Sequence, residues 1–319
     1  MSVVGGSAGR PAPGGSVPQG ATALRPAWES LPAQVRHIVE WRLGSAVVEA
    51  RSQDSGFTPG LASRLLLADG RRVFVKAAST EMAPWIVEAY RRECEVTAAL
   101  PAGVHAPRAR WTCEEGPWFV AVMDDVEGHH PRRPWRAEEL ATVVAMLAEN
   151  ARALTPPPHG LHVPLLADEL AAELVMVRDL DLPWRDTCVD LAERMLASPP
   201  TTVVHTDIRD DNVLLTEQGA VTVDWNFVAA GPAWFDTVSL LVQAYGDGID
   251  CDSVLAGDPS TRDLDPDLVD GVLALLLGYF SWAAAQEHVE TSPYLRSHQA
   301  WYRDATWKWL SDRRGWSTG

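Results

Sequence analysis

The amino-acid sequence predicts an α+β protein with two lobes: a small lobe built on a sheet, followed by a larger and mostly helical lobe. Two observations carry this prediction. Between residues 45 and 126, strand-like segments and turn signals surround one strongly amphipathic segment, whereas helical patterns dominate from about residue 127. A short β-forming stretch, 199–227, interrupts the helical part. Runs of strands followed by runs of helices indicate the α+β class.

The first part of the chain is expected to form a small sheet with one long helix. In chain order its elements are a helix over 30–44, a strand over 45–53, a hairpin over 61–78, a helix over 83–100 and a second hairpin over 108–126. The first helix has a serine cap, an early proline and a final glycine, which are common start and stop signals. Asp69 and Gly70 supply the turn of the first hairpin, and Gly116 and Pro117 that of the second.

The second part is expected to be mostly helical. Its periodicity predicts helices over 136–153, 165–179, 184–198, 234–245, 266–286 and 293–311. Between the third and the fourth of these, apolar residues on both sides of Gln218 and Gly219 predict two short paired strands. This pairing brings Asn212, which precedes the first strand, close to Asp224, which follows the second.

These patterns divide the chain into three units. Residues 1–28 are rich in Gly, Pro, Ser and Ala and have little to bury, so we expect a disordered tail. Residues 29–125 are expected to form the first lobe, and residues 126–319 the second.

Composition argues against several classes of protein. A formal net charge of −16 offers no basic face for a nucleic acid. The apolar run nearest to a membrane span, 271–285, is too short to cross a bilayer and reads as a buried helix. The four cysteines form no C-x-x-C pair and the N-terminus lacks an apolar signal core, so free thiols and a cytoplasmic location are expected. The oligomeric state stays open.

The chemistry of the chain is concentrated in "VVHTDIRDDNVLL", residues 203–215, where a polar loop lies between two apolar runs. With Asn212 and Asp224 close together, one amide oxygen and a carboxylate form a partial shell of hard oxygen ligands. Such a shell suits Mg²⁺ that keeps water molecules and takes its other ligands from phosphates. Asp207 is then left free to orient a hydroxyl.

These residues resemble a known family. "HTDIRDDN" is similar to the H-x-D-x-x-x-x-N catalytic loop of the aminoglycoside phosphotransferases, distant relatives of the protein kinases, and "VDWNF" resembles the segment that carries their metal-binding aspartate. The resemblance covers about residues 30–310 and implies a two-lobed protein-kinase-like fold. It implies ATP and Mg²⁺ as cofactors, Asp207 as the catalytic base, and Asn212 and Asp224 as metal ligands.

Other parts of the family pattern follow in the required order. "RRVFVKA" resembles the strand with the nucleotide-binding lysine, here Lys76, and "YRRECEV" the helix with its ion-pair partner, here Glu93. "FVAVMDDVEG" resembles the hinge, whose backbone near Asp124 and Val126 would bind adenine, and "GPAWFD" the segment whose buried aspartate, Asp236, braces the catalytic loop. "SGFTPG" departs from G-x-G-x-x-G, but Gly56 and Gly60 are candidates to cover the phosphates through backbone N–H groups.

The sequence also gives expectations for four further residues of the loop, with two alternatives for the first. An arginine two residues after the catalytic aspartate, Arg209, could clamp phosphate oxygens, or it could form a salt bridge to Asp210 or to the helices of the second lobe. His205 is expected to be structural, packed under the loop. Asp210 and Asp211 are expected to form a solvated face.

The acceptor is expected to be a hydroxylated small molecule, because no long activation segment follows Asp224 to hold a protein substrate. The candidates are aminoglycosides and other antibiotics, or metabolites of the choline, homoserine or sugar type. The acidic stretches 177–186 and 245–267 are candidates to line a pocket for a cationic acceptor, or are solvent-facing loops. Two alternatives from other classes are a metal-dependent hydrolase using His205, Asp207 and Asp224, and a catalytically inactive kinase-like binding protein.

Overall fold

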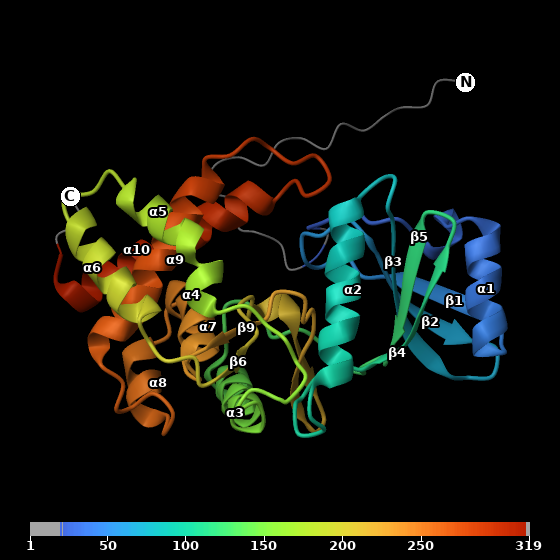
Figure 1. Cartoon of the computed structure of the whole chain (residues 1–319), viewed down its shortest axis with the longest axis horizontal. Helices are drawn as coiled ribbons and strands as arrows, with labels where there is room; N and C mark the ends of the chain where they lie inside the picture. The colour runs from blue at the N-terminus through green and yellow to red at the C-terminus, as the bar shows by residue number, and fades with distance from the viewer. Residues whose placement is uncertain (1–19, 21, 317–319) are drawn as a thin grey trace.

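The computed structural model describes Gly20 and residues 22–316, and it has the expected two-lobed α+β architecture (Figure 1). The strands are β1 (Val47–Ser52), β2 (Leu61–Leu67), β3 (Arg72–Ser79), β4 (Ala109–Glu115), β5 (Trp118–Met123), β6 (Thr202–Val204), β7 (Val213–Thr216), β8 (Gly219–Thr222) and β9 (Ala229–Gly231). The helices are α1 (Ala33–Leu43), α2 (Pro84–Ala99), α3 (Ala137–Ala153), α4 (Leu166–Glu169), α5 (Ala171–Arg178), α6 (Arg185–Leu196), α7 (Phe235–Gly246), α8 (Cys251–Gly257), α9 (Pro266–Ala284) and α10 (Leu295–Arg314), with short 3-10 turns η1 (Trp28–Ser30) and η2 (Asp210–Asn212).

The first lobe is an antiparallel sheet with one helix on each face. Its strand order is β1-β2-β3-β5-β4. Val35 and Val39 of α1 are buried with Val73 and Val75 of β3 on one face. On the other face α2 lies between the sheet and the helical lobe (Figure 1). Because side chains alternate along a strand, β3 points Lys76 toward α2, opposite to Val73 and Val75.

The second lobe is organised around α9, which packs against α5, α6 and α10. Among the described residues α9 is the one helix long and apolar enough to cross a membrane by length and composition, and 56% of its most apolar window is buried inside the protein. It therefore serves as the core helix of this lobe, as the sequence predicted for 271–285. The four cysteines are free and buried.

The small β-structure inside this lobe forms as expected, with one addition. β7 and β8 pair through a turn at Glu217 and Gln218, one residue earlier than expected, and the pairing sets Val213 opposite Thr222. The sequence did not predict β9, which pairs with β6 and places Val204 opposite Ala229. The structure also divides the expected helix 165–179 into α4 and α5, and it contains a helix, α8, inside the expected acidic loop.

A third group of buried residues joins the two lobes. Val96 and Leu100, at the end of α2, pack with Val203 and with Trp225, whose side chain is 1% exposed. The base of the catalytic loop and the segment after Asp224 are thus fixed to the same apolar cluster as the end of α2.

Part of the expected disordered tail is packed against the body of the protein. Residues 1–19 and 21 lie outside the described residues, but Thr22, Ala23 and Trp28 are each at most 5% exposed. The Thr22 N–H donates to the Asp54 carbonyl (3.0 Å) and the Leu24 N–H to the Thr291 carbonyl (2.8 Å). The prediction of disorder is therefore wrong for residues 22–28. The prediction rested on the small number of apolar residues in this segment. It failed because these few residues pack against parts of the protein that are distant in the sequence.

Candidate active site

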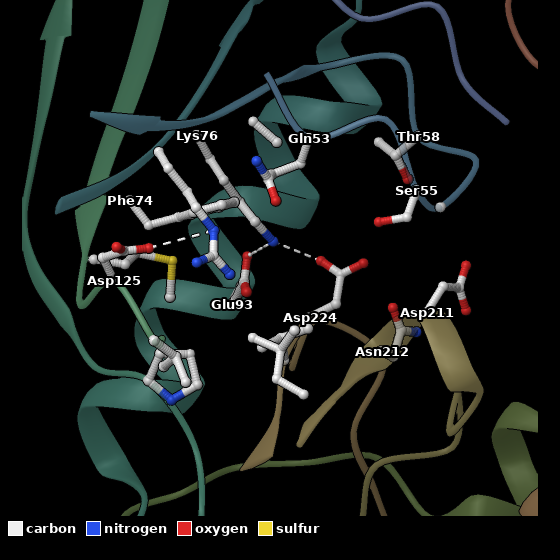
Figure 2. Close-up of a pocket in the computed structure, with 18 of the residues that line it drawn as sticks. Gln53, Ser55, Thr58, Phe74, Lys76, Glu93, Asp125, Asp211, Asn212 and Asp224 are labelled. Carbon is white, nitrogen blue, oxygen red and sulfur yellow. Dashed lines mark hydrogen bonds and ion pairs between the residues drawn. The ribbon is translucent and has the colours of Figure 1, made fainter. Parts of the chain in front are cut away.

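Three charged side chains meet at the centre of the cleft between the lobes. The Lys76 ammonium lies 2.5 Å from a Glu93 oxygen and 2.6 Å from Asp224 Oδ1. Figure 2 shows Lys76 between these two carboxylates, with Asn212 and Asp211 beyond Asp224. β3 supplies the lysine, α2 the glutamate, and the turn after β8 the aspartate. Residues from three distant parts of the sequence are thus brought together as the family resemblance implied.

The charges of this group support one another. Burial by itself lowers the pKa of Lys76, but Asp224 and Glu93 outweigh it and raise the pKa above its usual value. Burial opposes ionisation of Asp224 as well, yet Lys76 and then Arg25 hold the pKa of that carboxyl at about 2. Burial raises the pKa of Glu93, with Lys76 acting against it. Asp224 is therefore the carboxylate of the pair that stays ionised most readily.

The catalytic loop is held from below by Asp236, as the resemblance implied. Its two carboxylate oxygens accept the N–H groups of His205 (2.7 Å) and Thr206 (3.0 Å). His205 is 1% exposed, and its Nε2 lies 2.9 Å from the carbonyl of Val223. This confirms His205 as a structural residue. It couples the catalytic loop to the strand that leads to Asp224.

Asp207 and Asn212 face each other across the loop. The Asn212 Nδ2 donates to Asp207 Oδ2 at 3.0 Å and to the Asp207 carbonyl at 2.8 Å. The amide oxygen of Asn212 is thereby turned away from Asp207. Burial raises the pKa of Asp207 to about 6, against the opposing charge of Arg209. A carboxylate with a pKa this close to neutrality is suited to accept a proton from a hydroxyl.

Asp224 sits on a strained turn. Its φ of +70° is a left-handed conformation that costs a non-glycine residue free energy, and Thr206 at +67° is a second case on the catalytic loop. Trp225 holds the turn in place, because its ring is buried and its Nε1–H donates to the Thr222 carbonyl at 3.0 Å. This anchored tryptophan stands where protein kinases have a mobile phenylalanine.

The residues present fit a bound Mg²⁺. Asn212 offers an amide oxygen and Asp224 a carboxylate with a depressed pKa, and both line one cleft. Hard oxygen ligands that leave most positions to phosphates and water suit Mg²⁺. No group of three His, Cys, Asp or Glu side chains among the described residues is arranged to hold a metal by itself. A metal here would therefore depend on the nucleotide for its remaining ligands.

Arg209, Asp210 and Asp211 differ from what their sequence position indicated. Arg209 pairs with Asp207 and, at 2.8 Å, with Asp211. Asp210 is buried and accepts a hydrogen bond from the Gln243 amide at 2.5 Å. The expectation of a solvated face is wrong for both aspartates, because Arg209 compensates the burial of Asp211, and Arg133 and Gln243 that of Asp210.

The loop from Gln53 to Gly60 covers the cleft, and its two glycines serve different purposes. Gly56 lines the cleft with a φ of +79°. Gly60 is not among the lining residues. A Cβ at Gly60 would come 2.3 Å from the Tyr90 hydroxyl and 2.9 Å from Ile86, so glycine permits close packing of the loop on α2. Of the two glycines expected to cover the phosphates, Gly56 lines the cleft, whereas Gly60 lies behind it against α2.

The far end of the cleft is formed by the expected hinge. Asp124 and Val126 both line the cleft beyond the end of β5. Nearby, Arg64 lies 3.5 Å from Asp125. The cleft contains about 800 Å³ of empty space, its open mouth included.

The acidic stretches 177–186 and 245–267 do not line this cleft. Several carboxylates of the second stretch are engaged within the protein instead. The partners in the second stretch are Arg133 for Asp247, Ser253 for Asp250, and Arg313 and Trp309 for Asp252. Sequence reasoning also missed Arg25, which lines the cleft, and Glu173 and Tyr279, which lie outside its lining. No local motif marks them, since each comes from a segment far from the catalytic loop in the sequence.

Together, the sheet lobe, the helical lobe and the Lys76–Glu93–Asp224 cluster define the class of two-lobed, kinase-like phosphotransferases. The chain belongs to the phosphotransferase enzyme family, whose model matches residues 60–288, and it is a small-molecule kinase of this family. No curated protein matches the sequence.

Solved structures with the same fold include an aminoglycoside phosphotransferase, APH(4)-Ia, in a ternary complex with ADP and hygromycin B. It has 14% identity, a TM-score of 0.57, and coverage of 90% of this chain and 100% of that one. A choline kinase from Cryptosporidium parvum Iowa II has 11% identity, a TM-score of 0.53, and coverage of 92% and 93%. A protein assigned as a fructosamine-3-kinase from Haemophilus somnus 129PT has 11% identity, a TM-score of 0.54, and coverage of 90% and 97%.

Proposed function

We propose that the protein transfers the γ-phosphate of ATP to a hydroxyl group of an amine-bearing small molecule. The use of ATP is supported by one observation: Lys76 and Asp224 lie 2.6 Å apart, in the same cleft as Asn212. In kinases a lysine and a metal-binding aspartate of this kind hold the phosphates. The complex of APH(4)-Ia with ADP supports a nucleotide in the same fold.

In this proposal each residue has a defined task. Lys76 binds phosphate oxygens and is kept in position by Glu93. Asn212 and Asp224 hold Mg²⁺, which when bound would offset the negative charge that develops on the transferring phosphoryl group. Asp207 orients the acceptor hydroxyl and takes its proton. Arg209, now paired with Asp207 and Asp211, is close enough to the reacting end to bind the transferred phosphoryl group after release from Asp207.

The proposal that the acceptor carries an amine rests on two residues of the helical lobe, Tyr279 and Glu173. Burial raises the pKa of Tyr279 on α9, and the negative charges of Asp207 and Glu173 add to this effect. Glu173 Oε2, on α5, is buried without a hydrogen-bond partner among the described residues. An ammonium group would compensate this carboxylate. Hygromycin B, fructosamine and choline, which the names of the three similar structures mention, are all amines.

The test is a phosphate-transfer screen with ATP and Mg²⁺ against aminoglycosides, choline-like amines, amino sugars, homoserine and neutral sugars. We expect an amine-bearing compound to gain one phosphate by mass spectrometry, and Asp207→Asn to abolish the transfer. For that acceptor, Glu173→Gln should raise KM at least several-fold and leave KM for ATP unchanged. A neutral acceptor, or an amine whose KM ignores Glu173→Gln, would contradict the amine part. If an antibiotic is the acceptor, expression of the gene in a susceptible bacterium should confer resistance.

A further inference from the structure

Arg25 lies in the nucleotide cleft although it belongs to the segment before the first lobe. It lines the same cavity as Lys76, Gly56, Asn212 and Asp224. Its Nη2 donates to the Ser55 carbonyl at 2.9 Å and its Nη1 to the Gly60 carbonyl at 3.3 Å. The guanidinium therefore sits directly under the loop that covers the cleft.

The guanidinium of Arg25 has no carboxylate in direct contact among the described residues. Both of its hydrogen bonds go to neutral carbonyl groups, and it forms no ion pair with a carboxylate in the part of the chain that the structure describes. Its Nε is buried without a hydrogen-bond partner there. Arg25 as a whole is partly buried, and a buried donor without a partner costs free energy unless a ligand reaches it. By contrast, Lys76 and Arg64, which also line this cleft, each pair with a carboxylate, Glu93 and Asp125 respectively.

The position of Arg25 indicates which part of a nucleotide it would meet. A Cβ placed on Gly56 would come 3.1 Å from Arg25 Nη2 and 3.9 Å from Asp211 Oδ2. The guanidinium end of Arg25 thus lies on the side of the loop that faces Asp211 and the catalytic loop. Asp124 and Val126, the expected adenine side, line the other end of the cleft. Arg25 also contributes to the low pKa of Asp224, after Lys76.

The segment that carries Arg25 is fixed on both sides of the cleft. Thr22 Oγ1 donates to the Gly56 carbonyl at 2.6 Å, on the loop, and the Leu24 N–H donates to the Thr291 carbonyl at 2.8 Å, on the helical lobe. Because its backbone is already held, little ordering is needed when a ligand binds. A guanidinium placed in this way presents a planar fork that matches phosphate oxygens.

We propose that Arg25 is a phosphate-binding residue of the nucleotide site, which contacts the β- and γ-phosphates together with Lys76. The inference rests on the proposed use of ATP. It assigns to the segment before the first lobe a direct part in nucleotide binding, so that the site is built from three segments, the N-terminal segment, the sheet lobe and the helical lobe.

The test compares ATP, ADP and AMP binding, each with Mg²⁺, by isothermal titration calorimetry. Loss of a charge-assisted hydrogen bond corresponds to about a 10- to 100-fold loss of affinity. We expect Arg25→Gln to weaken ATP by this factor, ADP less, and AMP within about twofold. Arg25→Lys keeps the charge without the fork, and its ATP affinity should lie between those of the wild type and Arg25→Gln. It also serves as the second variant if Arg25→Gln does not fold.

The matched control is Thr22→Val, which removes the hydrogen bond to the same loop without touching the charge. Its effect, if any, should be equal for ATP, ADP and AMP. The inference is overturned if Arg25→Gln binds ATP as tightly as the wild type, or if it weakens ATP and AMP equally, as a purely structural brace would. A wild type that binds none of the three nucleotides would overturn the proposed function as well, so the two failures can be told apart.

Discussion

At the scale of single residues, the chemistry depends on Asp207. Replacing it with Asn keeps the hydrogen bond that it accepts from Asn212 but removes the proton acceptor. We expect Asp207→Asn to lower kcat by about 10²- to 10⁴-fold, the usual contribution of a general base. Affinity for ATP should stay within a few-fold, because the base acts on the acceptor. Initial rates and direct nucleotide titration check both parts, and a near-normal kcat would remove Asp207 from the catalytic role.

The metal role of Asp224 has a test that does not need an acceptor. In Asp224→Ala the Lys76 ammonium keeps Glu93, 2.5 Å away, but one of the two proposed metal ligands is gone. We expect ATP with Mg²⁺ to raise the melting temperature of the wild type more than ATP alone does, and this difference to vanish in Asp224→Ala. Thermal-shift titrations with and without Mg²⁺ measure it. Equal stabilisation of both proteins by ATP with Mg²⁺ would count against the assignment.

Some residues of the site could be predicted from the sequence and others could not. Asp207, Asn212 and Asp224 lie within eighteen positions of one another, joined by a hairpin whose turn is readable locally. The Lys76–Glu93 pair could be predicted because the two segments that carry these residues follow the order of the family pattern. Arg25 could not, since only the packing of a distant segment brings it to the cleft. For the same reason the burial of Asp210 and Asp211 was not foreseen.

At the scale of elements, strong periodicity and turn residues predicted most of the helices and strands. The unpredicted elements are short and lack such signals. β9 reads Ala-Ala-Gly, which has no β-branched residue, and forms because its backbone pairs with β6. α8 is seven residues long and is capped at its N-terminus by Asp250, whose side chain accepts the Ser253 N–H. The expected helix 165–179 is interrupted at Leu170, where α4 ends and α5 begins.

An element-scale prediction concerns the packing of the covering loop on α2. In Gly60→Ala the new Cβ would lie 2.3 Å from the Tyr90 hydroxyl oxygen. Overpacking of this kind typically costs about 1–3 kcal/mol of unfolding free energy. We expect Gly60→Ala to be destabilised by this amount in urea unfolding, and Tyr90→Phe in the same chain to restore part of it. Additive losses in the double variant would show that the clash with the hydroxyl is not the cause.

At the scale of the whole molecule, the N-terminal segment connects the covering loop with the helical lobe. Removal of residues 1–27 takes away the buried Thr22 and Ala23 and the hydrogen bonds to Asp54 and Thr291. We expect this deletion to lower the melting temperature by several degrees relative to a chain that lacks only residues 1–19. Differential scanning calorimetry of the two shortened chains makes the comparison. Equal melting temperatures would show that the contacts of residues 20–27 add nothing to stability.

The two lobes also meet at an aromatic contact that contains a histidine. His298 of α10 packs on Phe57 of the covering loop, with ring centroids 4.5 Å apart, and on Tyr302 at 4.8 Å. Burial lowers the pKa of His298 from 6.5 to about 3. The charged groups that act on it are Arg209 and Asp211 of the catalytic loop and Arg133, and the two arginines oppose its protonation.

This contact predicts how stability depends on pH. The unfolded chain protonates His298 near pH 6.5, whereas the folded protein does so only near pH 3. The contribution of neutral His298 to stability is therefore present above pH 6.5 and lost progressively as the pH falls toward 3. We expect the unfolding free energy of His298→Phe, which keeps an aromatic ring without a titrating group, to fall less steeply between pH 6.5 and 4.5 than that of the wild type. Urea titrations across this range measure the slope, and His37→Phe, at an exposed position of α1, controls for the loss of one histidine. Parallel curves for the wild type and His298→Phe would mean that the contact between the lobes tolerates a protonated His298.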